Sequence, residues 1–150
     1  MFRIIILATV IPAIFSTQGI ERCNAGNEMP TQTTVIGCSS TPCEVRLGES
    51  ARMEIIFTAP RNMEVLTPVT TAFLLGIAIP YELPLEIQRG CDHIVGATCP
   101  IAAGTTVTYI FEFPVNENYP QVRNLPVEVA LHDQQGVFSC ARVRIATVRG

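Results

Sequence analysis

Apolar and polar side chains alternate along several short stretches of this chain. Within residues 51–57, Met53, Ile55 and Phe57 fall on one face and charged side chains fall on the other. Alternation with a period of two residues is typical of a β-strand that buries one face and exposes the other. Later stretches repeat the pattern and predict strands over residues 106–115, 127–132 and 141–145. Their apolar faces carry Val107, Tyr109, Phe111, Phe113 and Val115, then Val127, Val129 and Leu131, then Ala141, Val143 and Ile145.

Residues 65–81 carry no charged side chain and alternate less regularly. We interpret them as one strand, or two with a bend, buried on both faces for part of their length. Turn-forming residues separate the apolar runs, and the chain holds 11 prolines and 10 glycines. With about six or seven strands and no long amphipathic helix, the pattern predicts an all-β fold of two packed antiparallel sheets.

The beginning of the chain has the pattern of a secretory signal peptide. Arg3 precedes a largely apolar stretch that is too short to cross roughly 30 Å of hydrocarbon. Thr17 and Gly19 are small residues at the spacing that a signal peptidase needs before its cleavage site. We therefore expect a signal peptide over residues 1–19, a single mature domain over residues 20–150, and a secreted protein.

Six cysteines in a short secreted chain are typical of a disulfide framework. Six cysteines allow many pairings, and the sequence alone does not choose among them. The short spacings make the local pairs Cys38–Cys43 and Cys91–Cys99 plausible, which would leave Cys23 with Cys140. The alternative, that some of these residues are free thiols or metal ligands, stays open at this point.

Composition and motifs exclude several classes of function. Disorder is excluded because 48% of the residues are apolar and only 15% are charged. The net charge of −3 and the absence of a basic run argue against binding to nucleic acid. The chain lacks a Gly-x-Ser-x-Gly motif, a Gly-rich phosphate loop, HExxH and CxxC. Its two histidines, His93 and His132, leave little for a metal site. We predict a non-enzymatic protein without cofactor or metal.

The order of the motifs resembles the ML-domain lipid-recognition family. Within that family, the chain is similar to the soluble cholesterol-transfer proteins of Niemann–Pick type C disease and to their arthropod relatives, including house-dust-mite allergens. The resemblance covers about residues 23–148. It rests on Cys38-Ser-Ser-Thr-Pro-Cys43, residues 74–81, Gly90-Cys91 through Cys99-Pro-Ile101, residues 109–115, Asn118-Tyr-Pro120, residues 127–133 and Cys140.

The resemblance implies an immunoglobulin-like β-sandwich with an internal apolar cavity, in which a lipid lies between the two sheets. It implies the pairs Cys23–Cys140, Cys38–Cys43 and Cys91–Cys99. A lipid in such a cavity gains roughly 25 cal/mol for each Å² of apolar surface removed from water. The expected ligand-binding residues are those of the alternating faces together with four that the resemblance adds. They are Met53, Ile55, Phe57, Tyr109, Phe111, Phe113, Val115, Val127, Val129 and Leu131, with Leu74, Ile79, Tyr81 and Tyr119 added. The alternative for each is ordinary core packing.

The sequence therefore predicts a secreted carrier that binds and transfers a sterol, a fatty acid or a similar small lipid, with a lysosomal or endosomal lumen as the other location. The alternatives are an immune-recognition or adhesion module that binds microbial lipid or protein through its surface, and an unrecognised secreted hydrolase. Some sterol-binding relatives carry Trp near Val129 and Ala141, whereas this chain has no Trp. The ligand therefore stays open. Residues 83–88 form an alternating apolar edge that we expect either to contact a membrane or receptor transiently, or to pack as a loop.

Overall fold

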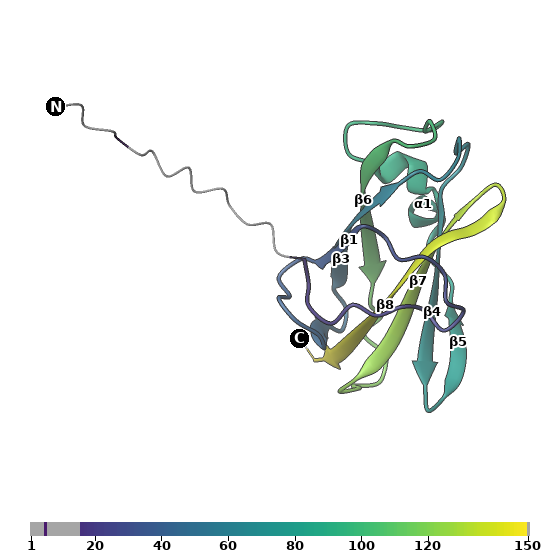
Figure 1. The fold of residues 1–150 in the computed structure, drawn as a ribbon. Helices are drawn as coiled ribbons and strands as arrows, with labels where there is room; N and C mark the ends of the chain where they lie inside the picture. The colour runs from purple at the N-terminus through teal and green to yellow at the C-terminus, as the bar shows by residue number, and fades with distance from the viewer. Residues whose placement is uncertain (1–4, 6–15, 150) are drawn as a thin grey trace.

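A computed structural model describes residue 5 and residues 16–149 of the chain, which form two β-sheets (Figure 1). The three-stranded sheet has the order β1-β3-β6, with β1 at Gln32–Val35, β3 at Ser50–Thr58 and β6 at Thr106–Pro114. The five-stranded sheet has the order β2-β8-β7-β4-β5. Its strands are β2 at Cys43–Arg46, β8 at Gly136–Val148, β7 at Leu125–Asp133, β4 at Thr67–Leu74 and β5 at Ile77–Tyr81. The predicted all-β architecture of two sheets is confirmed.

The core lies between the two sheets and is built by the alternating faces. In β3 and β6, Met53 pairs with Phe111 and Ile55 pairs with Tyr109, and all four side chains are buried. Val127, Val129 and Leu131 of β7 are buried as well. Neighbouring strands run antiparallel except β2 and β8, which run parallel. The apolar faces predicted for these strands are confirmed, because each sheet buries one face against the other.

Residues 65–81 form the hairpin of β4 and β5, with a turn at Leu75 and Gly76. The expectation that part of this segment is buried on both faces was wrong. β4 alternates between buried and more exposed positions along its first half, and β5 is an edge strand with Ile77 and Ile79 exposed. Leu75 adopts a positive φ of 52° at the turn and is almost fully exposed. The absence of charged side chains over residues 65–81 therefore accompanies a hairpin whose second strand lies at the sheet edge, and not a strand buried in the interior.

The segment after β5 contains two short helical turns. α1 covers Leu85–Gln88 and a 3₁₀ turn covers Gly90–His93. The alternating apolar edge expected over residues 83–88 was therefore wrong, because a helical turn occupies most of this stretch. Leu83 packs into the core while Leu85 is exposed. The backbone N–H of Gly90 donates to the Leu66 carbonyl at 2.8 Å, in a space too tight for a side chain.

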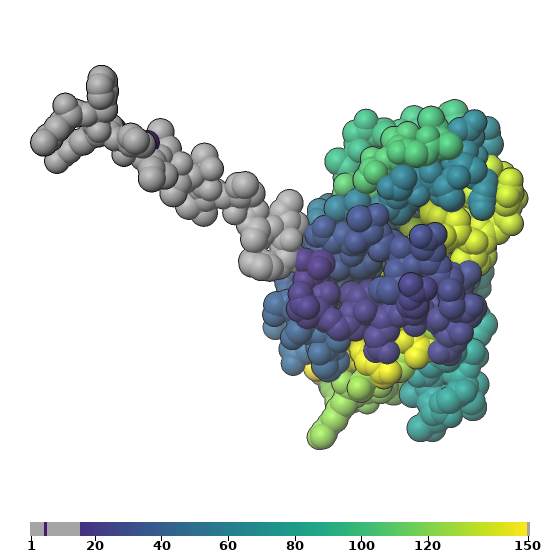
Figure 2. Space-filling model, viewed as in Figure 1, coloured from purple at the N-terminus to yellow at the C-terminus, as the bar shows by residue number. Residues whose placement is uncertain are grey.

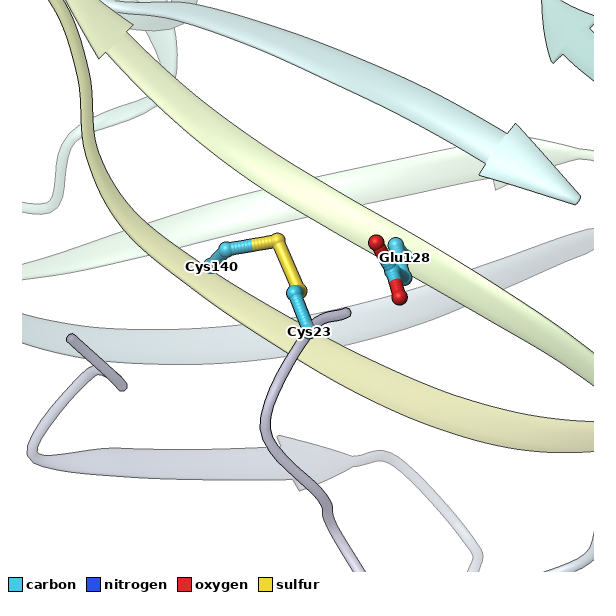
Figure 3. Close-up of side chains that lie close together, drawn as sticks. All are labelled: Cys23, Glu128 and Cys140. Atoms are coloured by element: carbon cyan, nitrogen blue, oxygen red, sulfur yellow. A yellow bond between two sulfur atoms is a disulfide. The ribbon is translucent and has the colours of Figure 1, made fainter. Parts of the chain in front are cut away.

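Three disulfides join the pairs Cys23–Cys140, Cys38–Cys43 and Cys91–Cys99, as the resemblance implies. Cys23 ties the segment that precedes β1 to β8 (Figure 3). Figure 2 shows the segment that follows residue 16, in purple, lying across one face of the molecule.

The expected signal peptide falls largely outside the described residues, but its last residues do not. Thr17 is buried, its hydroxyl accepts a hydrogen bond from the Val35 N–H at 2.8 Å, and it donates to the Cys38 carbonyl at 2.9 Å. Thr17 therefore packs as part of the folded domain, although the sequence places it before the expected cleavage site at Gly19.

Candidate functional site

An apolar pocket of about 330 Å³ opens between the two sheets. It lies at the end of the sandwich where β4 and β6 finish and β7 begins. Both sheets and the loop between β6 and β7 contribute to its wall. The lining residues are Ala72, Leu74, Ile79, Pro80, Tyr81, Glu82, Phe113, Val115, Tyr119, Pro120, Val122, Leu125, Val127, Ile145 and Thr147.

Deeper between the sheets, side chains fill most of the space. A second void of about 20 Å³ lies there and shares Phe113, Val127 and Ile145 with the pocket. It also touches Met53, Phe111, Val129 and other inward-facing residues. The pocket therefore ends against a wall of apolar side chains, beyond which a little unfilled space continues.

The fourteen sequence-predicted binding residues divide into three groups in the structure. Seven line the pocket: Leu74, Ile79, Tyr81, Phe113, Val115, Tyr119 and Val127. Three line the small void but not the pocket: Met53, Phe111 and Val129. Four line neither hollow and are buried in the core: Ile55, Phe57, Tyr109 and Leu131.

Sequence reasoning did not select the other pocket residues. Ile145 lies on an apolar strand face that the alternation identified, so the sequence pattern could have included it among the binding residues. Pro120 and Val122 belong to a loop without periodicity, and Thr147 is a polar residue that reads as surface.

Three aromatic rings gather at the mouth of the pocket. The ring of Tyr81 lies 4.6 Å from that of Phe113 and 5.8 Å from that of Tyr119, between centroids. The Tyr81 hydroxyl donates a hydrogen bond of 2.6 Å to the Pro114 carbonyl. Because β5 and β6 belong to different sheets, this bond ties the two layers together at the mouth. Burial, and then the neighbouring Tyr119, raise the pKa of Tyr81, so its hydroxyl stays protonated and able to donate.

Thr147, a polar residue of the wall, is fully engaged with the protein. Its hydroxyl donates to the Pro120 carbonyl and accepts from the Val122 N–H, both at 2.7 Å. These bonds hold the loop that follows Tyr119 against β8. The side of the pocket formed by this loop therefore offers a ligand mainly apolar contact.

A wider open groove of about 780 Å³ meets the pocket at Tyr81, Glu82 and Val115. Leu85 of α1 lines this groove and is 73% exposed. The groove also includes the polar side chains of residues 116–118. The mouth of the pocket therefore adjoins a surface of mixed polarity.

One cluster of described residues has the composition of a metal site, and its chemistry argues against that role. Cys23, Cys140 and Glu128 lie close together (Figure 3), but the two sulfur atoms form a disulfide and are not thiolates. The Glu128 carboxylate already accepts hydrogen bonds from the Asn24 N–H at 2.9 Å and from Arg142.

In the part of the chain that the structure describes, no helix is long and apolar enough to span a bilayer.

The sequence of this chain matches a known protein family and several known proteins. The family model described as "ML domain" matches residues 18–147. The chain is similar to the mouse protein named NPC intracellular cholesterol transporter 2, at 27% identity over 132 residues, which covers 88% of this chain and 85% of that protein. It is similar to the mite group 2 allergen Eur m 2 of Euroglyphus maynei, at 25% identity over 150 residues and 99% of each chain.

The fold also matches that of a solved structure. It is similar to the crystal structure of a Niemann-Pick type C2 protein from Japanese carpenter ant, with a TM-score of 0.72 and 18% sequence identity. The match covers 86% of this chain and 98% of the ant chain. At this identity the likeness concerns the fold alone.

Proposed function

Because this chain belongs to the ML domain family, we propose that it is a secreted carrier that binds one small lipid in the pocket between its two sheets and transfers it. The observation that carries the proposal is the apolar pocket of about 330 Å³, which is lined from both sheets and closed on one side by a loop whose Pro120 carbonyl and Val122 N–H are bonded to Thr147. The mouse relative is named a cholesterol transporter, which supports a lipid as the cargo.

The affinity of such a site comes from burial of the ligand. An apolar chain that loses about 200 Å² of surface to this pocket gains about 5 kcal/mol, before the costs of immobilisation. Selectivity comes from the shape of the wall and from the Tyr81, Glu82 and Tyr119 side chains at the mouth.

The pocket volume bears on the class of lipid. At about 330 Å³ it lies at the low end of the usual range for small-molecule sites, roughly 300–1,000 Å³. We therefore propose a fatty acid or another single-chain lipid, or a sterol that enters by displacing the side chains around the deeper void. A lipid with two or more long chains exceeds this space.

The proposal includes no catalytic step, in keeping with the family's role as lipid carriers. Three disulfides agree with passage through the oxidising secretory pathway, and we propose an extracellular location or a lysosomal or endosomal lumen. We further propose that the groove beside the mouth, with exposed Leu85, contacts a membrane or receptor during transfer.

Lipid extraction tests the proposal directly. The protein, expressed in eukaryotic cells and purified under native conditions, is extracted into organic solvent and analysed by mass spectrometry. We expect one lipid class at close to one molecule per protein. A protein that carries no lipid, and that binds neither a fluorescent fatty acid nor a fluorescent sterol, would refute the carrier and favour a surface-binding module.

A pair of matched variants assigns the binding to the pocket. Val127 and Val107 are inward-facing valines with similar burial, but Val107 lines neither the pocket nor the deeper void. We expect Val127→Phe to weaken binding of the fluorescent fatty acid about tenfold by filling the space, and Val107→Phe to change it about twofold or less. Equal losses in the two variants, at equal stability, would place the ligand elsewhere.

A further inference from the structure

Three buried hydroxyl groups of the described residues lack any hydrogen-bond partner. They are Thr70 Oγ1, the Tyr109 hydroxyl and Ser139 Oγ. Their residues are exposed by only 1%, 0% and 4%. Buried polar atoms nearly always find a partner, because an unpaired one has lost its water and gained nothing. Three such groups in one small domain call for a physical explanation.

Strand register places all three hydroxyls on the inner faces of the sheets. Thr70 of β4 pairs with Val129, and Ser139 of β8 pairs with Leu131, so both share the buried face of the five-stranded sheet. Tyr109 of β6 pairs with Ile55 on the buried face of the opposite sheet. The three residues therefore point into the space between the layers from both sides.

The same register places these groups beyond the inner end of the pocket. Along β6 the inward-facing residues run from Phe113, which lines the pocket, through Phe111, which lines the small void, to Tyr109. On β4, Thr70 is the next inward position after Ala72, which lines the pocket. A ligand that extends from the pocket through the void is therefore directed toward these hydroxyls.

We propose that Tyr109, with Thr70 and Ser139, forms a polar subsite at the deep end of the lipid site, which accepts a lipid with a neutral oxygen, a hydroxyl or a carbonyl, at the end that enters first. This inference rests on the proposed lipid-carrier function. It adds that the cargo is oxygenated at its inner end, for example a fatty acid with a terminal hydroxyl group or a sterol hydroxylated on its side chain.

The chemistry of the subsite favours a neutral oxygen over a charged one. Burial raises the pKa of Tyr109, so its hydroxyl remains a neutral donor. Among the described residues, the buried polar and charged side chains include no cationic one, so an ionised carboxylate at this depth would lack a counter-charge. A hydroxyl on the ligand accepts a hydrogen bond from Tyr109 and donates one to either of the aliphatic hydroxyls.

Two lipids that differ only at the inner end test the inference. Straight-chain fatty acids and their ω-hydroxy counterparts, over a series of chain lengths, are titrated against the full protein by displacement of a fluorescent fatty acid. At the chain length that spans the site, we expect the ω-hydroxy acid to bind about tenfold more tightly. In Tyr109→Phe, we expect this ratio to fall to about one. Because the ratio compares two ligands on one protein, a general loss of packing cancels.

The variants Thr70→Val and Thr106→Val provide the matched comparison. Both replace a threonine hydroxyl with a methyl group, but Thr70 is buried beside the proposed subsite and Thr106 is exposed. We expect Thr70→Val to reduce the preference for the ω-hydroxy acid and Thr106→Val to preserve it. Unfolding curves of both variants verify that they remain folded.

Each contrary result has a distinct meaning. Equal binding of the two acids at every chain length, with both bound, overturns the deep subsite and leaves the carrier function intact. An unchanged preference in Tyr109→Phe also overturns it. Failure of the wild-type protein to bind either acid or a fluorescent sterol overturns the carrier function together with the subsite.

Discussion

The bond between the Tyr81 hydroxyl and the Pro114 carbonyl makes a specific prediction about ligand exchange. Tyr81→Phe removes the single hydrogen bond that joins β5 to the end of β6, and leaves the ring free to stack on Phe113. A neutral hydrogen bond contributes about 0.5–1.5 kcal/mol, and the half-buried position lets water reach the freed carbonyl. We therefore expect a loss of about 1 kcal/mol in the free energy of unfolding.

The same loss sets the expected change in rate. If the mouth must part for a lipid to leave, the bond is broken in the transition state. Its removal then lowers the barrier by about 1 kcal/mol and speeds release about fivefold. Urea unfolding measures the first quantity, and stopped-flow release of a bound fluorescent fatty acid measures the second.

Tyr119→Phe is the control for this experiment, because Tyr119 also lies at the mouth and its hydroxyl has no bond to Pro114. We expect a clearly smaller change in the release rate for this variant. A Tyr81→Phe protein that loses stability but releases the lipid at the wild-type rate would refute the idea that this bond closes the mouth.

Three further predictions follow from other contacts. We propose that a chain starting at Ile20 is less stable to urea than one starting at Thr17, by about 2 kcal/mol, because it lacks the buried hydroxyl and its hydrogen bonds; equal stabilities would contradict this. Gly90→Ala should lower the melting temperature by the equivalent of about 1–3 kcal/mol, because a Cβ would lie 2.5 Å from the Leu66 carbonyl oxygen; an unchanged melting temperature would show that the backbone adapts. Burial raises the pKa of Tyr109 above its usual value of about 10. Its contribution to stability is therefore complete below about pH 10 and is lost above it, as the unfolded chain ionises first. Unfolding curves from pH 8 to 11 that lose no stability above pH 10 would count against this burial.

The strands that the sequence predicted well are those with one face in the core. In β3, β6 and β7, burial of alternate residues leaves a period-two pattern that can be read without a structure. β1 and β2 have only four residues each, too few for the pattern to stand out. β5 has an apolar sequence but lies at the sheet edge, where most of its residues are exposed, so apolar composition alone predicted too much burial for it.

The site was harder to predict than the fold for a related reason. Alternation shows which side chains point between the sheets, but not how far each lies from the open end. Ile55 and Phe113 therefore looked equivalent, although only Phe113 lines the pocket. The residues taken from the family resemblance, such as Leu74 and Tyr119, all line it. The pocket residues Pro120 and Val122, on the loop after β6, are held in place by hydrogen bonds to Thr147. Such bonds leave no periodic pattern in the sequence.

The disulfide between Cys23 and Cys140 has a consequence for how the chain responds to proteolysis. It closes a covalent circle that contains β1 through β7 and the start of β8. A single proteolytic cut anywhere between the two cysteines opens this circle but releases no fragment, because both pieces remain joined through the sulfur atoms. A nicked molecule therefore keeps its strands covalently joined.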